Sequence, residues 1–229
     1  SMEIIAGRSD PNSGGFTVLV AGGGATGVEM AGQLAELKQE ALPSTYPELN
    51  PAQVHVVLVE MAPYLLAPFD DSLRKYALAE LVKRGVDVRL NTAISEVHAD
   101  RVDFKGGESI PVDLVIWAAG VSGNPAIREW GIPIGRGGRI EVNSDLRVLG
   151  EENIFAIGDI SLTVDNPLPQ LAQPAIQTGK FAAKQIARLH RGAPTEKFEY
   201  HNKGTMATIG RGDAVLQTPF GLKLKGVPA

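Results

Sequence analysis

The first half of the chain alternates short apolar runs with longer amphipathic segments. Residues 17–21 (TVLVA) and 54–59 (VHVVLV) are continuous apolar runs, as expected for parallel strands buried on both faces of a sheet. Apolar residues at helical spacing follow the two runs, over about 27–42 and 70–85. A further strand at 86–90 completes a β-α-β-α-β order, which predicts an α/β fold with a right-handed, doubly wound parallel sheet.

The pattern changes after this sheet. Residues 94–113 alternate apolar and polar positions, with Gly106 and Gly107 as a hairpin turn. We expect an antiparallel cross-over meander here, laid across the parallel sheet, before residues 114–120 (LVIWAAG) return as a buried strand running into a glycine loop. The three prolines of segment 43–53 are expected to break any regular element between the first helix and the second strand.

The pattern also predicts the domain organisation. Residues 1–15 are expected to be a flexible lead-in, 16–139 a first domain, and 140–229 a second. Within the second we expect a strand over 154–159, a helix over 172–190, and a glycine-rich strand pair from about Thr205.

Composition narrows the class of protein. The net charge is 22 − 26 = −4, so no basic stripe favours nucleic acid as a partner. The 229-residue chain has no cysteine, so redox chemistry requires a bound cofactor, and a reducing, cytoplasmic setting is the default. The apolar runs have the length of strands and are too short for a membrane span.

The candidate chemistry begins directly after the first strand. Gly22, Gly24 and Gly27, separated by Gly23, Ala25 and Thr26, form a Gly-x-Gly-x-x-Gly pattern. The first glycine permits the tight turn, the second lets the backbone approach a pyrophosphate, and the third allows close packing of helix on strand. Because a strand precedes the pattern and a helix follows it, the sequence predicts a Rossmann-like NAD(H)-binding domain over 16–139.

Glu60 ends the second strand, where the ribose-binding acid of such domains lies. It comes later than the usual spacing, and the proline-rich insert accounts for the excess. A carboxylate there accepts hydrogen bonds from both ribose hydroxyls and repels a 2′-phosphate, so we expect NAD(H) and not NADP(H). An ordinary acidic strand end is the alternative interpretation.

Six ordered blocks of the chain resemble the type II (alternative) NADH:quinone oxidoreductases. In that family a nicotinamide-binding domain is inserted in a flavin-binding domain, and an antiparallel meander links the two. The resemblance extends from about Phe16 to the C-terminus. The six blocks are GGGATGVEMAG, VEMAPYLL, VIWAAGV, NIFAIGD, LAQPAIQTG and MATIGRGDAV.

The resemblance implies cofactor contacts in two of these blocks. Ala119 and Gly120, in VIWAAGV, would lie at the cofactor. Asp159, which ends NIFAIGD, would hold the ribityl chain of FAD, and Gly158 would let the backbone approach it. A simple turn aspartate is the alternative for Asp159.

The resemblance also implies catalytic positions. Glu29 matches the family glutamate near the nicotinamide and flavin rings, and Gln173 and Gln177 would line the quinone pocket. The alternatives are a helix-dipole partner for Glu29 and solvated helix glutamines for the other two. No metal site is expected, because the four histidines (His55, His98, His190 and His201) show no ligand spacing and are interpreted as structural.

Two features of the family are missing from this sequence, which is therefore interpreted as a fragment. We find no glycine fingerprint for the flavin domain ahead of residue 16, and no amphipathic membrane-binding segment after LKLKGVPA. We therefore expect FAD to be absent or weakly bound in this chain. We also expect the 154–159 strand and the 172–190 helix to be less stably ordered than the first domain, which favours a homodimer.

The resemblance implies an NADH dehydrogenase. In the intact parent, hydride would pass from NADH to FAD and on to a quinone, with the protein peripheral to the inner, cytoplasmic face of the membrane. A soluble NADH-dependent flavoprotein reductase of a protein acceptor is an alternative. A non-catalytic NAD(H)-binding module is another, for the isolated chain. The lack of cysteine argues against the disulfide-reductase and sulfide-oxidising branches.

Overall fold

The computed structural model describes residues 15–48 and 50–227, which form two compact units. Of the described residues, one unit contains those up to Gly120 together with those from Gly204 onward, and the other is Val121–Lys203. This division differs from the expected boundary at 139, since the first unit ends at Gly120. Residues from Gly204 onward join the first unit because they pack their apolar side chains into its core. Apart from Gly15, the predicted lead-in lies outside the described residues.

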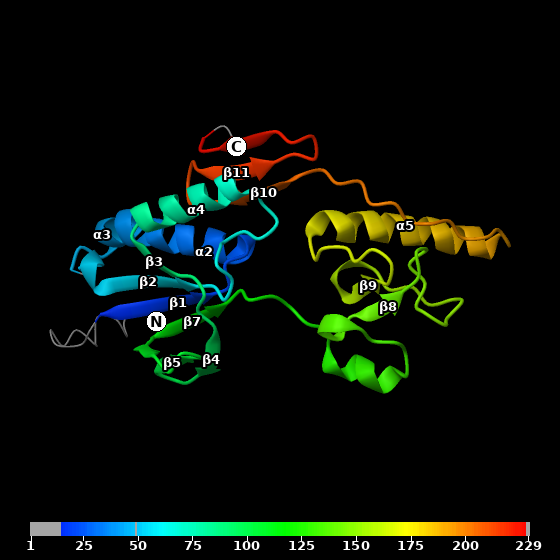
Figure 1. The fold of residues 1–229 in the computed structure, drawn as a ribbon, viewed down its shortest axis with the longest axis horizontal. Helices are drawn as coiled ribbons and strands as arrows, with labels where there is room; N and C mark the ends of the chain where they lie inside the picture. Colours follow the sequence, from blue (N-terminus) through cyan, green and yellow to red (C-terminus); the bar gives the residue numbers. More distant parts are fainter. Residues whose placement is uncertain (1–14, 49, 228–229) are drawn as a thin grey trace. The chain divides into compact units, whose positions relative to one another are not determined.

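The first unit is built on a four-stranded parallel sheet in the order β3-β2-β1-β7 (Figure 1). Three of the strands are largely apolar and β3 (VDVR) alternates apolar and charged residues, and the residues in the middle of β1 are fully buried. The predicted α/β fold with a parallel sheet is confirmed. The strands are β1 (Phe16–Ala21), β2 (Val54–Val59), β3 (Val86–Arg89) and β7 (Leu114–Trp117).

Helices cover one face of this sheet and an antiparallel meander covers the other (Figure 1). Successive strand residues point to opposite faces, so Val20 packs with the helices and Leu19 packs with the meander. The predicted meander thus takes the place of helices on the second face. The helices are α2 (Ala25–Glu36) and α4 (Asp71–Lys83), and the meander is β4 (Ile94–Val97), β5 (Arg101–Phe104) and β6 (Ser109–Pro111).

The first helix runs further than its sequence indicates. A π-helical turn η1 (Leu37–Ala41) and a short helix α3 (Leu42–Thr45) continue it, and a 3₁₀ turn η2 (Pro51–Gln53) precedes β2. The prediction that segment 43–53 breaks all regular structure was therefore wrong. Pro43 lies at the start of α3, directly after the π-helical turn η1.

A small antiparallel sheet lies on the other side of α2 and α4 from the parallel sheet (Figure 1). Its strands are β10 (Thr205–Thr208), β11 (Ala214–Gln217) and β12 (Lys223–Lys225), one more than predicted. Ala207, Ile209 and Val215 bury their side chains against the helices. A β-carbon on Gly32 of α2 would lie 2.7 Å from the nitrogen of Gly210, so this glycine permits the close approach.

Polar contacts fix the small sheet to α4. Asp70 caps the helix by accepting from the Ser72 N–H, and its carboxylate pairs with the Lys223 ammonium at 2.6 Å. The Lys223 hydrogen bond, followed by those of Ser72, holds the pKa of Asp70 well below its ordinary value. Tyr76 donates its hydroxyl to Asp213 at 2.9 Å. The contacts of Asp70 with Lys223 and of Tyr76 with Asp213 join residues more than 130 positions apart in the chain.

The second unit combines one long helix with short strands and turns. Helix α5 (Ala172–His190) has the predicted bounds. The predicted strand 154–159 was wrong, because within the described residues Phe155 makes only an isolated bridge, to Arg147, and a 3₁₀ turn follows. The other elements are η3 (Pro125–Trp130), η4 (Arg136–Gly138), β8 (Ile140–Val142), η5 (Gly158–Ile160) and β9 (Ser161–Thr163).

None of the helices in the described part of the chain combines the length and apolar character of a membrane span.

Candidate functional site

The glycine turn after β1 adopts the backbone that its sequence requires. Gly22 has φ +109°, and a β-carbon on it would lie 2.6 Å from the carbonyl oxygen of Ala118. A β-carbon on Gly27 would lie 1.8 Å from the carbonyl oxygen of Gly22. Both positions therefore exclude a side chain, the first by conformation and contact and the second by contact with the turn itself.

The middle glycine of the motif faces open space. A β-carbon on Gly24 would meet nothing within 4 Å, and Gly24 is the N-terminal cap of α2 without any capping side chain. The helix begins at Ala25 and Thr26, which are only partly covered or exposed. The N-terminus of α2 thus has no capping side chain, and the residue before it, Gly24, leaves the backbone accessible. Free backbone N–H groups at an accessible helix N-terminus are suited to binding a phosphate group.

Glu60 lies beside this turn, as expected. It follows β2 directly, and its half-buried carboxylate accepts two backbone hydrogen bonds, from the Gly23 N–H at 2.6 Å and from the Ala62 N–H at 2.7 Å. Each carboxylate oxygen has a further lone pair for a ligand hydroxyl. The carboxylate is therefore part of the turn as well as a candidate ribose ligand.

Ala119 and Gly120 complete the same edge of the sheet. They follow β7 and are exposed, and the Cα of Ala119 would lie 2.7 Å from a β-carbon on Gly22. The strand order reverses between β1 and β7. In open parallel sheets, ligands bind at the carboxyl ends of the strands where this reversal occurs. The glycine turn, Glu60 and residues 119–120 meet at that point.

Glu29 occupies the second turn of α2 and contacts the small sheet. Its Oε1 accepts the backbone N–H of Thr208 at 3.2 Å, and its side chain is half-buried. The expected position near reacting rings is neither shown nor opposed by this contact. The hydrogen bond gives Glu29 a structural role in holding β10 against α2.

The candidate flavin residues belong to the second unit. Gly158 has φ +66° and donates its N–H to Thr178 Oγ1 at 3.1 Å, which holds the loop against α5. Asp159 is exposed, and its backbone carbonyl accepts from Gln170 at 3.2 Å. The exposed carboxylate of Asp159 thus stands at a glycine-bearing turn beside a helix.

The two candidate glutamines differ in their surroundings. Gln173 is half-buried near the start of α5. Gln177 forms a reciprocal pair with the backbone of His201, donating Nε2–H to its carbonyl and accepting its N–H, both at 3.0 Å. The amide of Gln177 keeps one N–H and one lone pair for other partners.

Arg139 was not predicted and lies next to the same region. Its guanidinium is buried, donates to the carbonyls of Ser161 and Leu168, and has an Nε without a partner among the described residues. Burial lowers the pKa of Arg139, and the nearby Asp159 carboxylate opposes that effect. The sequence gives no sign that Arg139 is buried and binds the carbonyls of Ser161 and Leu168, because an arginine after two glycines is compatible with any loop.

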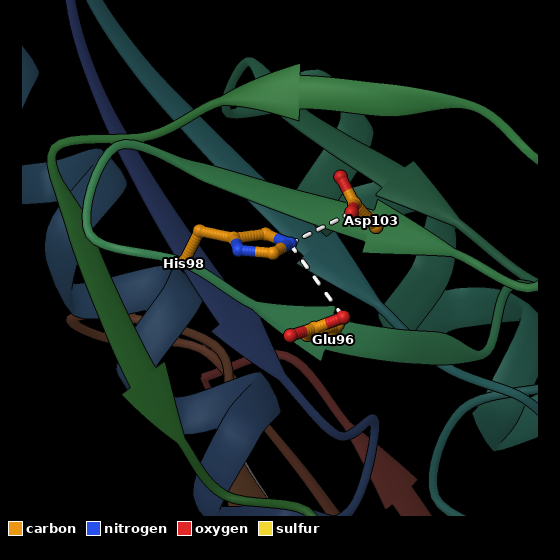
Figure 2. A group of neighbouring side chains, drawn as sticks. All are labelled: Glu96, His98 and Asp103. Carbon is orange, nitrogen blue, oxygen red and sulfur yellow. Dashed lines mark hydrogen bonds and ion pairs between the residues drawn. The ribbon is translucent and has the colours of Figure 1, made fainter.

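The meander brings together His98 and the carboxylates of Glu96 and Asp103, and the sequence analysis did not predict this cluster (Figure 2). His98 Nε2 lies 2.8 Å from Asp103 Oδ2 and 3.8 Å from Glu96 Oε2. Asp103 also accepts from Ser109 at 2.6 Å and from Arg101 at 3.2 Å. The Ser109 and His98 hydrogen bonds, with Arg101, lower the pKa of Asp103. The cluster therefore links β4, β5 and β6 through one carboxylate.

The pyridine nucleotide-disulphide oxidoreductase family matches residues 5–179, and the chain belongs to that family. The chain is 37% identical over 215 residues to the type II NADH:quinone oxidoreductase NdhA of Mycobacterium tuberculosis, across 88% of this chain and 45% of that protein. It is 35% identical over 237 residues to the type II NADH:quinone oxidoreductase of Staphylococcus aureus (strain NCTC 8325 / PS 47), across 98% and 56% respectively.

A solved structure shows the same fold. The structure of NDH2 from Plasmodium falciparum in complex with NADH superposes with a TM-score of 0.85 at 18% identity, over 98% of this chain and 63% of that one. This chain spans about half the length of the curated relatives that it matches.

Proposed function

We propose that the first unit binds NAD(H) across the glycine turn. The observation that carries the proposal is Gly24, which presents bare backbone to open space at the uncapped N-terminus of α2. A pyrophosphate placed there would receive the free N–H groups of the first turn and the positive end of the helix dipole. The family match and the NADH-bound structural neighbour support the same ligand.

Glu60 gives the site its preference for NADH over NADPH in this proposal. Its carboxylate lies beside the turn and has lone pairs left for the two ribose hydroxyls. A 2′-phosphate would bring a second negative charge against it, and like charges at contact distance disfavour binding. Ala119 and Gly120 would border the nicotinamide end, because they stand at the reversal of strand order.

We further propose that the chain is part of an NADH:quinone oxidoreductase that carries FAD. The relatives named above are type II NADH:quinone oxidoreductases, and Gly158 and Asp159 offer a glycine-bearing turn with an exposed carboxylate for a ribityl hydroxyl. FAD, when bound, supplies the acceptor of the hydride. The residues of this chain bind and orient: Asp159 at the ribityl chain, Glu29 at the reacting rings, and Gln173 and Gln177 at the quinone.

The 229-residue chain itself should bind NADH more readily than FAD. The glycine fingerprint between a strand and a helix occurs once in its sequence, at residues 22–27, and that turn serves NAD(H) in the proposal. We propose that the intact parent works at the inner face of the membrane, and that the isolated chain can form a homodimer through exposed apolar side chains such as Ile176 and Ile186.

Calorimetric titration tests the nucleotide assignment. NADH and NADPH are titrated into the purified chain, and its absorption spectrum is recorded for a flavin band. We expect NADH to bind, NADPH to bind more weakly, and no stoichiometric flavin. A chain that binds neither nucleotide would overturn the proposal. Assays of the intact parent with a quinone and with protein acceptors then separate a quinone reductase from a reductase of a protein partner.

A further inference from the structure

The fingerprint explains three of the glycines in the turn and leaves Gly23 unexplained. A β-carbon on Gly23 would lie 2.6 Å from Leu65 Cδ2 and 2.9 Å from Glu60 Cβ. Both neighbours belong to the segment that follows β2. Residues 60–66 therefore leave no room for a side chain at position 23, whereas a side chain at position 24 would meet no atom within 4 Å.

The same segment holds both polar groups of Gly23. The Gly23 N–H donates to Glu60 Oε2 at 2.6 Å, and the Gly23 carbonyl accepts the Leu66 N–H at 2.8 Å. The peptide groups on either side of Gly23 are thus oriented by residues 37 to 43 positions later in the chain. Their orientation determines where the next N–H groups, at the start of α2, point.

Leu66 adopts a backbone that leucine normally avoids. Its φ is +52°, and its side chain is 1% exposed in the core beside Leu65 and Leu58. A left-handed conformation at a non-glycine residue persists only where its surroundings determine it. Here the buried side chain and the hydrogen bond to Gly23 hold Leu66 in place, so the segment is anchored independently of any ligand.

We propose that residues 60–66 are a positioning clamp that sets the glycine turn for the pyrophosphate, with Glu60 acting through the Gly23 N–H in addition to any contact with the ribose. This inference rests on the proposed NAD(H) site and concerns how that site is held. Glu60, Gly23 and Leu66 are positioning residues in it. Removing the Glu60 carboxylate then loosens pyrophosphate binding even for a nucleotide that has no ribose hydroxyls.

The test uses ADP and 2′,3′-dideoxy-ADP, which share adenine and pyrophosphate and differ in the ribose hydroxyls. Both are titrated by NMR into the full chain, as wild type and as Glu60→Gln. We expect Glu60→Gln to weaken dideoxy-ADP about 10-fold, because a charge-assisted hydrogen bond to the turn is lost, and to weaken ADP at least as much. Unchanged dideoxy-ADP affinity with weakened ADP would show that Glu60 serves the ribose alone and would overturn the clamp.

Gly23→Ala provides a second arm that leaves the carboxylate in place. The added methyl group displaces residues 60–66, so both ligands should weaken by a similar factor. Gly106→Ala is the matched control, because Gly106 lies in the meander turn with no atom within 4 Å of an added β-carbon, and it should bind both ligands as wild type does. Equal binding by Gly23→Ala and Gly106→Ala would also overturn the clamp.

Hydrogen exchange gives a readout without any ligand. In the clamp the Gly23 amide is protected by the side chain of Glu60, so its exchange should accelerate at least 10-fold in folded Glu60→Ala, which offers no acceptor. Unchanged exchange at Gly23 contradicts the inference even if Gly23→Ala does not fold. Failure of the wild type to bind ADP or NADH would remove the proposed function and the clamp together, whereas the outcomes above remove only the clamp.

Discussion

A β-carbon added to Gly27 would lie 1.8 Å from the carbonyl oxygen of Gly22, so the start of α2 is in direct contact with the turn that precedes it. Gly24, two residues after Gly22, has no neighbour within 4 Å of the same added atom. The two glycines of one motif are therefore required for different reasons. Gly27 is required by the contact of α2 with the turn, and in the proposed site Gly24 is required by the ligand.

Alanine substitutions separate these two roles. Gly27→Ala should lower the free energy of unfolding by about 1–3 kcal/mol, because backbone must move to relieve the contact. Gly24→Ala should change it by less than about 1 kcal/mol, since Gly24 has an ordinary φ of −72°. The same Gly24→Ala should weaken NADH by about 10-fold or more, because its methyl group occupies the approach of the pyrophosphate. Urea unfolding and nucleotide titration measure the two effects; wild-type NADH affinity in Gly24→Ala would contradict this.

Substitutions of Glu60 test the choice of nucleotide. Glu60→Gln should weaken NADH roughly 10- to 100-fold, because charge-assisted hydrogen bonds to the ribose are lost. Glu60→Arg should weaken NADH similarly and improve NADPH, because a cation then meets the 2′-phosphate. Parallel titrations of both nucleotides decide it. If Glu60→Gln binds NADH as wild type does, the carboxylate is structural only.

The ligand-free stability of Glu60→Gln should also fall. A hydrated strand-end carboxylate would leave stability unchanged, but Glu60 accepts backbone N–H groups from Gly23 and Ala62. A neutral amide offers one acceptor where two are used, so we expect a loss of about 1 kcal/mol in the free energy of unfolding. Urea unfolding without nucleotide measures it, and an unchanged midpoint would argue for a solvated carboxylate.

Tyr76 makes the docking of the small sheet sensitive to high pH, because its contribution to stability is lost as the pH rises. Burial, and then the hydrogen bond to Asp213, raise the pKa of Tyr76 to about 12. A raised pKa in the folded state stabilises the protein below the ordinary tyrosine pKa of about 10, and this stabilisation is lost as pH rises toward about 12. Tyr76→Phe should therefore unfold more easily by about 1 kcal/mol at pH 8 and lose less stability between pH 8 and about pH 11.

The control for Tyr76 is Tyr64→Phe, because the ring of Tyr64 lies against Arg74 and phenylalanine preserves that ring. Tyr64→Phe should match the wild type across this pH range. If the free energy of unfolding falls equally with pH in the wild type and in Tyr76→Phe, the hydroxyl of Tyr76 does not couple the sheet to α4.

Substitutions of Gln177 test how the chain at His201 is held against α5. Gln177→Ala removes both hydrogen bonds to the His201 backbone, and should reduce the stability of the second unit by about 1–2 kcal/mol. Gln177→Glu keeps an acceptor for the His201 N–H and loses the donor to its carbonyl. Exchange of the His201 amide should accelerate in Gln177→Ala and stay slow in Gln177→Glu. Equal acceleration in both variants would show that the acceptor does not protect this amide.

The two units should differ in their resistance to opening. The apolar side chains of Ile176 and Ile186 on α5 are about half exposed, whereas α2 is covered on both sides by sheets. Amide exchange should therefore be faster in α5 than in α2, since few buried contacts hold the former. Equally slow exchange in the two helices, measured in a monomer, would contradict this prediction and the proposed homodimer.

The sequence by itself determined those elements whose signal is local. Strand β2 and helix α5 have their predicted bounds because apolar spacing along a short segment is sufficient to define them. The glycine motif likewise predicted its own turn, since Gly22 adopts φ +109° and a β-carbon on Gly27 would lie 1.8 Å from the carbonyl oxygen of Gly22, five residues earlier. The position of Glu60 beside the turn followed from the rule that parallel strands end at one edge.

Only the tertiary structure decided which distant segments meet. The sequence predicted segment 205–225 as a strand pair of the second domain, yet it packs on α2 and α4. This packing buries the apolar side chains that the two helices present on the side away from the parallel sheet. The register of β4 against β5 placed Glu96 opposite Asp103 and brought His98 to both. The closure of Leu65 and Glu60 over Gly23 depends on contacts 37 or more residues apart, and no local pattern encodes such contacts.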